Sequence, residues 1–542
     1  MPFLWRLKSF SSGWDCLLLL MKNSMLDGNK EVAIATIGCL QSAAQCQNKK
    51  GNLPVTYLCS IIDMYEAAMK MSISINNKSR DKVKQEILRG LGELYVQSQL
   101  VFSVQMFTKL LSIIDVAVVE QTLQNYNVET EFEHIPPVLR TVLDILPILR
   151  PTPNISSMWK DLLRRLLLYL PKPVSDNDQT SFTNSGDKSE RPGEINTDST
   201  TAGKSSDSSP IIPACIQNNL LGAKLVTVLV DLLLQAPEAE KYEMCSEIIQ
   251  CLRRCMVTRR DNPGGALWRV AAESCNRVVV GVLSSHSENY EPNSNLFKTA
   301  KLGIWKEVAE LYEIFLIGHC GRPMPSNSLS SELRKADEAF EITILSVLSD
   351  KILKEATDAP PHILRRLIST IDTCASRMSS LPVHSVELIP HCCRFSLTCL
   401  QKLFSLCSLK DDPNGWSSSR VEVSKIAIGV IVARCHCIIE RFLIEEKSLN
   451  GKPFPRSRLE EIIYVLNELS LVQLHEETAA SLSLPSSLRH CSSASKQSHL
   501  LALFPSLCDL VMAREDTIRE LVHLLLRLIV DELAIEKLSS ST

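Results

Sequence analysis

The amino-acid sequence predicts an all-α protein, an armadillo/HEAT-like helical solenoid of stacked antiparallel helix pairs. Apolar residues make up 45% of the 542 residues, glycine is scarce at 19, and aromatic residues reach only 5%, which is a helical, leucine-rich profile. Apolar side chains recur at three- and four-residue steps, so they project from one face of a helix. Period-two alternation between hairpin turns, which is typical of strands, is hard to find. A long row of such helices buries its apolar faces most economically as stacked pairs.

The opening segment, residues 14–40, comes closest to one complete repeat unit. A leucine-rich helix from Trp14 is followed by a turn at Asp27-Gly28-Asn29 and a second helix. The small residues Ala33 and Ala35 of that second helix are expected where the two helices pack closely. No strict repeat period is visible along the chain, so this unit predicts the architecture and not a repeat length.

Four later segments show the apolar stripe most clearly. They contain Val83, Ile87, Leu91, Leu94 and Tyr95; Tyr242, Cys245, Ile249, Leu252 and Met256; Leu459, Ile462, Ile463, Leu466 and Leu469; and Ile518, Leu521, Val522, Leu525, Leu528, Ile529 and Leu533. Pro237 precedes the second stripe at a position favourable for a first helical turn. Ser457 with Glu460, and Thr517 with Glu520, predict capping boxes at the starts of the third and fourth helices.

One composition shift divides the chain. The stretch from Val174 to Pro210 is rich in Ser, Thr, Asp, Asn and Gly and has almost no large apolar side chains, so it cannot offset the entropy of ordering. We therefore expect an N-terminal helical-repeat block (1–173), a disordered linker (174–212) and a C-terminal helical-repeat block (213–538). The linker is open to two interpretations, a passive spacer and a phosphorylatable regulatory segment.

Charge and cysteine usage limit the function classes. The net charge of −3 gives no basic surplus for a phosphate backbone, so nucleic acid is not expected as a partner. The 19 cysteines fall inside apolar helical runs, which favours a reducing compartment. Residues 1–8 lack a signal-peptide pattern, so we expect no secretion. The longest apolar stretch, Leu220 to Leu234, is interrupted by Lys224 and Asp231, so any membrane attachment is expected to be peripheral.

Two clusters, His391-Cys392-Cys393 and Cys435-His436-Cys437, contain residues that can bind zinc. Structural zinc sites usually pair ligands across a tight turn, and neither cluster has a Cys-x-x-Cys knuckle with a second pair. Cys437 continues the stripe of Val423, Ile426, Val430 and Ala433, so we expect it to be a small buried apolar group. We predict no metal-binding, cofactor-binding or catalytic residues, and no small-molecule substrate.

Other polar clusters have simpler interpretations. Pro263-Gly264-Gly265 lacks the strand that a phosphate-binding loop needs, so it is expected to be a turn between helices. Glu445-Glu446 and Glu476-Glu477 are expected on solvated helix faces, because nothing apolar is arranged to separate their pKa values. The basic residues Lys160, Arg164 and Arg165 beside Trp159 fit either a solvated face or contact with acidic lipid headgroups.

Several blocks resemble one known family. The stretch from Leu367 to Ser408 reads LISTIDTCASRMSSLPVHSVELIPHCCRFSLTCLQKLFSLCS, and the block Arg420 to Leu471 contains RCHCIIERFLIEEKSLNGKPFPRSRLEEIIYVLNEL with a Gly-x-Pro turn. Both are similar to the C-terminal region of the monensin-sensitivity (Mon-two) family. Weaker similarity covers Ser294 to Ile317 and Trp14 to Leu40. The chain resembles the last third of these longer proteins. The resemblance therefore implies that it does not include the family's N-terminal region, which is linked to dimerisation and membrane recruitment.

The resemblance implies a non-enzymatic scaffold related to the large Arf guanine-nucleotide exchange factors. Such a protein would act in endosome-to-Golgi retrieval and vacuolar protein sorting, on the cytoplasmic side of Golgi, trans-Golgi network and endosome membranes. A Dopey-family protein and an Arf-like small GTPase would be its partners. The alternative is an exchange factor or regulator acting on an Arf-like GTPase, although no element suited to displacing the nucleotide is found. A HEAT-type nuclear transport or assembly factor shares the architecture but not these blocks.

Overall fold

A computed structural model describes residues 8–26, 29–48, 55–71, 77–124, 135–170, 219–259, 265–283, 295–318, 331–355, 359–378, 390–409, 416–449, 451–483 and 496–532. These residues form 19 α-helices with short 3₁₀ turns, and no β-strand occurs among them. The predicted all-α repeat architecture is therefore confirmed. The contacts divide the chain into two compact units, Met1–Glu240 and Lys241–Thr542.

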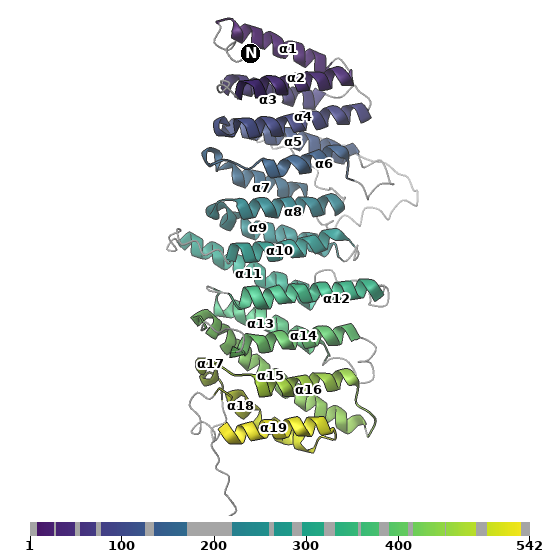
Figure 1. The fold of residues 1–542 in the computed structure, drawn as a ribbon, viewed down its shortest axis with the longest axis vertical. Helices are drawn as coiled ribbons and strands as arrows, with labels where there is room; N and C mark the ends of the chain where they lie inside the picture. Colours follow the sequence, from purple (N-terminus) through teal and green to yellow (C-terminus); the bar gives the residue numbers. More distant parts are fainter. Residues whose placement is uncertain are drawn as a thin grey trace, which may run out of the picture. The chain divides into compact units, whose positions relative to one another are not determined.

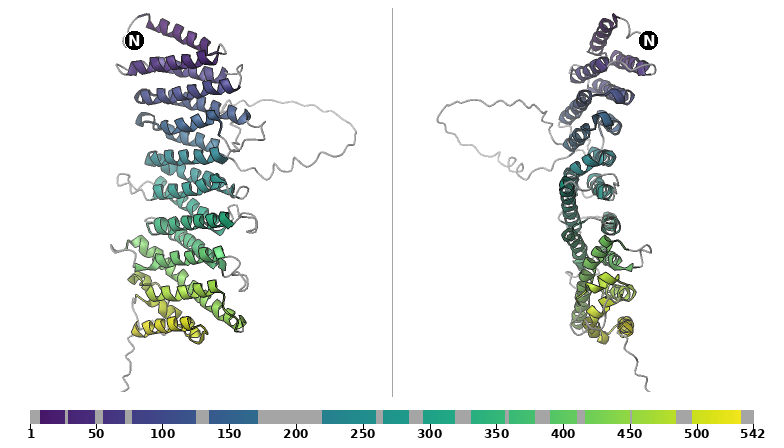
Figure 2. Two further views of the ribbon diagram at one scale, coloured as in Figure 1. Left: turned by 45° about the vertical axis from the view of Figure 1, so that its right-hand side comes forward. Right: turned by 90° about the vertical axis from the view of Figure 1, so that its left-hand side faces the viewer.

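The first unit contains eight helices in two layers (Figures 1 and 2). They are α1 (Phe10–Leu26), α2 (Lys30–Asn48), α3 (Val55–Met71), α4 (Asn77–Ser98), α5 (Val104–Gln124), α6 (Pro137–Ile145), α7 (Met158–Tyr169) and α8 (Asn219–Gln235). The odd-numbered helices pack on one another in sequence, and so do the even-numbered helices. Lys84 near the start of α4 pairs with Glu120 near the end of α5, so consecutive helices run antiparallel.

The second unit repeats this arrangement with eleven helices. They are α9 (Glu238–Val257), α10 (Ala266–Leu283), α11 (Asn295–Ile317), α12 (Ser331–Ser346), α13 (Pro361–Ala375), α14 (Pro390–Cys407), α15 (Ser418–Leu449), α16 (Arg456–Leu471), α17 (Glu476–Ala480), α18 (Ser498–Asp509) and α19 (Asp516–Glu532). One layer holds α10, α12, α14, α16 and α19, and the other holds α11, α13, α15 and α18. The segment Val347–Leu353, which directly follows α12, is a π-helix of seven residues.

The predicted apolar stripes form the core. All five stripe residues of α4 and all five of α9 are buried, as are Ile518, Val522, Leu525 and Ile529 of α19. In α16, Leu459 and Ile463 are half-buried whereas Ile462, Leu466 and Leu469 are fully buried. These helices pack against their neighbours through their apolar faces. Each fully buried large side chain stabilises the fold by roughly 1.5–3 kcal/mol.

Asn29 starts α2, because its Oδ1 accepts hydrogen bonds from the backbone N–H groups of Glu31 and Val32, at 3.0 and 3.4 Å. Within α2, Ala33 is buried but Ala35 is exposed, so the prediction that both lie at the helix contact is wrong for Ala35. The two positions are separated by about 200° around the helix, so a single packing partner cannot cover both.

Both predicted capping boxes are wrong. Pro455 occupies the N-cap of α16 and makes no side-chain cap, so Ser457 lies inside the first turn. Glu460 pairs instead with Arg456 at 2.7 Å. In α19, Thr517 is the second helical residue. The Gly-x-Pro turn is confirmed at its glycine, since Gly451 has φ +89°, a conformation that favours glycine.

The predicted linker, residues 174–212, lies outside the described residues and stays a prediction. On the far side of it, α8 packs against α6 and α7, so by contacts it belongs to the first unit. Among the described helices, none is both long and apolar enough to cross a membrane.

Candidate functional site

The cysteines and histidines that could bind metal are dispersed by the fold. Cys435 is fully buried, while His436 and Cys437 are exposed, and His436 Nδ1 lies 2.7 Å from the Ser506 hydroxyl of α18. The side chains of His391, Cys392 and Cys393 lie outside the described residues. Where side chains are described, no group of three or more His, Cys, Asp or Glu residues is arranged to hold a metal ion.

The burial predicted for Cys437 is wrong. The buried stripe of α15 runs through Val423, Ala427, Ile431 and Cys435, so the true register differs from the predicted one by two residues at the cysteines. α15 is a helix of 32 residues that packs on α13, α14, α16 and α18. Because several neighbours contact it along its length, a stripe read from one end of the sequence does not identify the buried face at the other end.

Burial raises the pKa of several core thiols, which disfavours the thiolate form. Burial raises the pKa of Cys245 and of Cys407 to about 12. For Cys251, a hydrogen bond donated by the Cys255 thiol outweighs burial and, together with the Arg254 guanidinium, lowers the pKa to about 7. The Cys251 side chain is nevertheless only 2% exposed, so its thiolate does not reach a substrate.

Acidic residues predicted to be solvated are partly buried. Glu445 is 8% exposed and its Oε1 lies 3.4 Å from Arg458 Nη2, so the prediction of a solvated face is wrong here. Glu461 pairs with Arg441 in the same cluster, and burial raises the pKa of both carboxyls. These antiparallel contacts fix α15 to α16. Glu476 and Glu477 are exposed as predicted, whereas Glu446 is half-buried.

The basic cluster on α7 also serves packing. Arg165 pairs with Asp115 of α5, and Tyr169 donates a hydrogen bond to the same carboxylate. Trp159 is buried. One of the three predicted surface charges is therefore used between α5 and α7. Contact of Lys160 and Arg164 with lipid headgroups stays a prediction, as does the turn at Pro263-Gly264-Gly265, of which only Gly265 is described.

A buried charge network surrounds α12. Asp337 accepts from Arg259 at 3.4 Å and from Arg269 at 2.9 Å, and Arg259 also lies 3.4 Å from Glu341. The Arg259 guanidinium stacks over the Trp268 ring at 4.6 Å. Nearby, Arg394 of α14 pairs with Glu338 at 2.9 Å, and Arg377 approaches Glu341 at 3.9 Å. The network links α10, α12 and α14 with the residues that directly follow α9 and α13, so its charges join neighbouring helices of the stack.

A surface groove separates α4 from α6 in the first unit. It is open to solvent, spans about 710 Å³ when that solvent is included, and is lined by Arg89, Gly92, Glu93, Val96, Gln97, Asp144, Ile145 and Ile148. Gly92 allows the close approach of the helices, because a Cβ there would lie 3.3 Å from Ile145 Cγ2. Val96 is 50% exposed and Ile148 is 40% exposed. Leu100, one turn beyond Val96, is 88% exposed.

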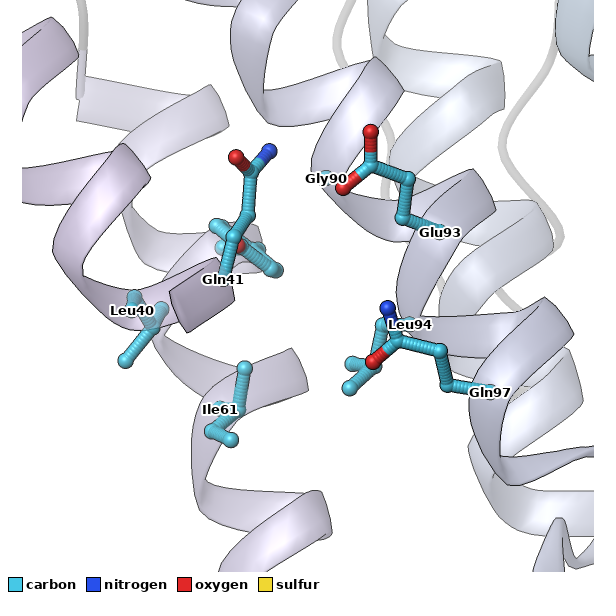
Figure 3. A pocket seen from close by; sticks show the side chains of 8 residues that line it. Leu40, Gln41, Ile61, Gly90, Glu93, Leu94 and Gln97 are labelled. Carbon is cyan, nitrogen blue, oxygen red and sulfur yellow. The ribbon is translucent and has the colours of Figure 1, made fainter. Parts of the chain in front are cut away.

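The other side of α4 borders a smaller hollow (Figure 3). It measures about 210 Å³ and is lined by Leu40, Gln41, Ile61, Tyr65, Gly90, Glu93, Leu94 and Gln97. Figure 3 shows Gln41 of α2 across from Glu93 of α4 in the upper part of the view, with Leu40, Ile61, Leu94 and Gln97 lower. Burial, and then the Glu93 carboxylate, raise the pKa of Tyr65 well above its usual range, so this phenol stays protonated.

The two hollows share Glu93 and Gln97, which makes α4 the wall between them. The smaller hollow has polar side chains from both α2 and α4, but Glu93 is its single carboxylate, so it offers no acid–base pair. The larger one combines exposed aliphatic side chains with charged rims, as expected for a surface that binds another chain. The stripe pattern did not reveal this groove; the two glycines of Gly90-Leu91-Gly92 inside a helix are the sequence signal that could have pointed to a close approach.

The comparisons with known proteins agree on one family. The profile described as the C-terminal region of Mon2 protein matches residues 87–526. The human "Protein MON2 homolog" is 25% identical over 236 residues, covering 42% of this chain and 13% of the relative. The Caenorhabditis elegans "Monensin-resistant homolog 2" is 24% identical over 280 residues, covering 51% and 15%. The Drosophila melanogaster "Protein MON2 homolog" is 18% identical and covers 93% and 32%. The chain thus matches less than a third of each relative's length.

Proposed function

Because the chain belongs to the Mon2 family through its C-terminal region, we propose that it is a non-enzymatic scaffold in Golgi and endosome vesicle trafficking. Its role is to hold other proteins on the outer surface of its helix rows. The finer role is endosome-to-Golgi retrieval and vacuolar protein sorting, at the cytoplasmic face of Golgi, trans-Golgi network and endosome membranes. A Dopey-family protein and an Arf-like small GTPase are the proposed partners.

One observation carries the proposal: apolar side chains are exposed along a built groove, while many of the charged side chains are used to join helices. Val96 and Ile148 are exposed on opposite walls of the α4–α6 groove. Arg259, Asp337 and Glu445 are buried in ion pairs between helices. Charges used in this way stabilise the framework, whereas the exposed aliphatic surface is available to a partner.

The first test is direct binding. The purified full chain is immobilised and exposed to a purified Dopey-family protein at concentrations from 0.1 to ~10 µM, a range that covers typical specific complexes. We expect retention with a dissociation constant in the micromolar range or tighter. No retention at the highest concentration would remove the proposed partner.

The second test separates a scaffold from an exchange factor. Release of a fluorescent nucleotide from a purified Arf-like GTPase is followed with and without the chain. A scaffold leaves the release rate within about twofold of its intrinsic value, whereas an exchange enzyme accelerates it by orders of magnitude. Such acceleration would replace the proposal with the enzymatic alternative.

A further inference from the structure

The α4–α6 groove has two chemically different ends. At one end, Glu93 of α4 and Asp144 of α6 lie on opposite walls. About one turn further along, Val96 and Ile148 follow, both exposed, and Leu100 is exposed in the 3₁₀ turn that follows α4, just beyond the lined part of the groove. The groove therefore runs from a carboxylate pair to an aliphatic patch, and its two walls follow the same order.

The carboxylates at the acidic end have no ion-pair partner among the described residues. The neighbouring Arg89 is paired with Glu86 at 2.5 Å, and the Arg140 guanidinium, one turn before Asp144, faces the Ile135 carbonyl at 3.5 Å. Two exposed carboxylates facing one groove repel each other and attract a cation. A bound chain that places a Lys or Arg between them complements this end.

The aliphatic end of the groove determines which side chains the rest of a bound segment must present. Val96 of α4 and Leu100 of the following 3₁₀ turn η3 (Gln99–Val101) are four residues apart in sequence, and Ile148 stands opposite Val96, so these side chains suit a partner whose apolar side chains recur every three or four residues. A helix laid in a groove between two helices presents its anchors with this spacing. At Gly92 the helices α4 and α6 approach each other closely, since a Cβ there would lie 3.3 Å from Ile145 Cγ2, so the anchors of a bound helix pack over the walls of the groove and not between α4 and α6.

We propose that the α4–α6 groove docks an amphipathic helix of a partner protein, with aliphatic anchors over Val96, Leu100 and Ile148 and a Lys or Arg between Glu93 and Asp144. This inference rests on the proposed scaffold function and names the surface and the partner chemistry for it. The order of the two ends also places the basic residue and the aliphatic anchors at opposite ends of the bound helix.

The test uses a phage-displayed library of helical 18-residue peptides, randomised on one face and selected on the purified full chain. Selected peptides are then titrated by fluorescence anisotropy. We expect enriched peptides to carry aliphatic residues at three- and four-residue steps and a Lys or Arg at one end. Selection of no binders, or of acidic or uncharged peptides only, would overturn the proposal.

Variants place the binding in the groove. Val96→Ser/Ile148→Ser is expected to weaken a selected peptide at least tenfold, as for central aliphatic anchors. The matched control is Leu524→Ser/Val530→Ser on α19, whose side chains are 44% and 37% exposed, and binding there should stay within about twofold. All four positions are partly exposed, so the variants should fold. Equal binding to the groove and control variants would contradict the proposal.

A second pair of variants tests the charges. Glu93→Gln/Asp144→Asn is expected to weaken a Lys-containing peptide by roughly fivefold or more at low salt and to remove most of its salt dependence. The control, Glu520→Gln/Asp531→Asn, changes two exposed carboxylates of α19. An unchanged affinity in the groove variant would show that no cation lies between the carboxylates and would refute the assignment.

A second copy of this chain is the competing occupant. Sedimentation equilibrium of the full chain decides it: a dimer that becomes a monomer on Val96→Ser/Ile148→Ser would assign the groove to self-association and overturn our proposal. A monomer in both cases, together with peptide binding, supports it. The groove proposal and the scaffold function can fail separately. If the wild-type chain and the groove variants retain a Dopey-family protein equally, the scaffold function stands but its binding surface is not the groove.

Discussion

Replacing Arg259 by methionine tests whether buried charges hold the second unit together. The Arg259 side chain is 7% exposed and lies 3.4 Å from both Asp337 and Glu341. Methionine keeps the apolar contact with Trp268 but leaves two carboxylates without this partner. Breaking a buried pair from one side costs about 3–5 kcal/mol, and loss of the cation–π contact adds up to about 2 kcal/mol. Arg269 still reaches Asp337, so we expect about 3 kcal/mol.

The assay is amide hydrogen exchange of the full chain, which reports the local free energy of opening of each helix. Exchange in α10 and α12 should accelerate by a factor of roughly 100 for a loss of about 3 kcal/mol. The matched control is Arg456→Met in α16, whose side chain is 89% exposed in an i,i+4 pair with Glu460. Such a surface pair contributes at most about 0.5 kcal/mol.

The double variant Arg259→Met/Asp337→Leu removes both charges. It should be less destabilised than Arg259→Met alone, because an apolar replacement of a buried pair is often nearly neutral. An effect below about 1 kcal/mol for Arg259→Met, or a double variant no more stable than the single one, would refute the reasoning.

Three further predictions concern single residues. His499 is fully buried, which lowers its pKa from 6.5 to about 4; the unfolded chain binds the extra proton first, so this stability is present above pH 6.5 and is lost as pH falls toward 4. Hydrogen exchange in α16 and α18 should show about 2 kcal/mol less local stability at pH 5 than at pH 7. The His499→Gln chain should lose this pH difference, and a variant that retains the difference would contradict the assignment to His499. Gly451→Ala, at φ +89°, should lower the free energy of unfolding by about 1–2 kcal/mol, whereas Gly429→Ala, which meets nothing within 4 Å, should raise it by about 0.5–1 kcal/mol; urea denaturation giving the same sign for both would count against the glycine argument. Gly90→Ala should cost about 1–3 kcal/mol, because its Cβ would lie 2.8 Å from the Tyr65 hydroxyl, and an unchanged melting temperature would show that the helices separate freely.

The helices could be predicted from the sequence because burial imposes the helical period locally. The stripe at Val83, Ile87 and Leu91 repeats within a few residues, and each of these side chains is buried. Such a pattern requires no knowledge of which helix lies opposite. The same local information identified the glycine of the Gly451 turn, where only the backbone conformation matters.

The ion pairs and the groove could not be predicted, because they depend on partners far apart in the sequence. Arg259 and Asp337 are 78 residues apart, and Glu93 and Asp144 come from different helices. A charged residue on a helix therefore looks solvated until its neighbour is known, which is why Glu445 was misassigned. The capping-box prediction for α16 is wrong for a local reason. Pro455 occupies the N-cap position, so Ser457 lies two residues further on, inside the first turn.

The claim that partners bind the outer surface of the first unit is tested most directly by hydrogen-exchange footprinting of the full chain with and without a purified Dopey-family protein. We predict slower exchange in the last two turns of α4, in η3 (Gln99–Val101) and in α6, with little change in α10 and α12. Protection confined to the second unit, or no protection at saturating partner, would contradict this claim.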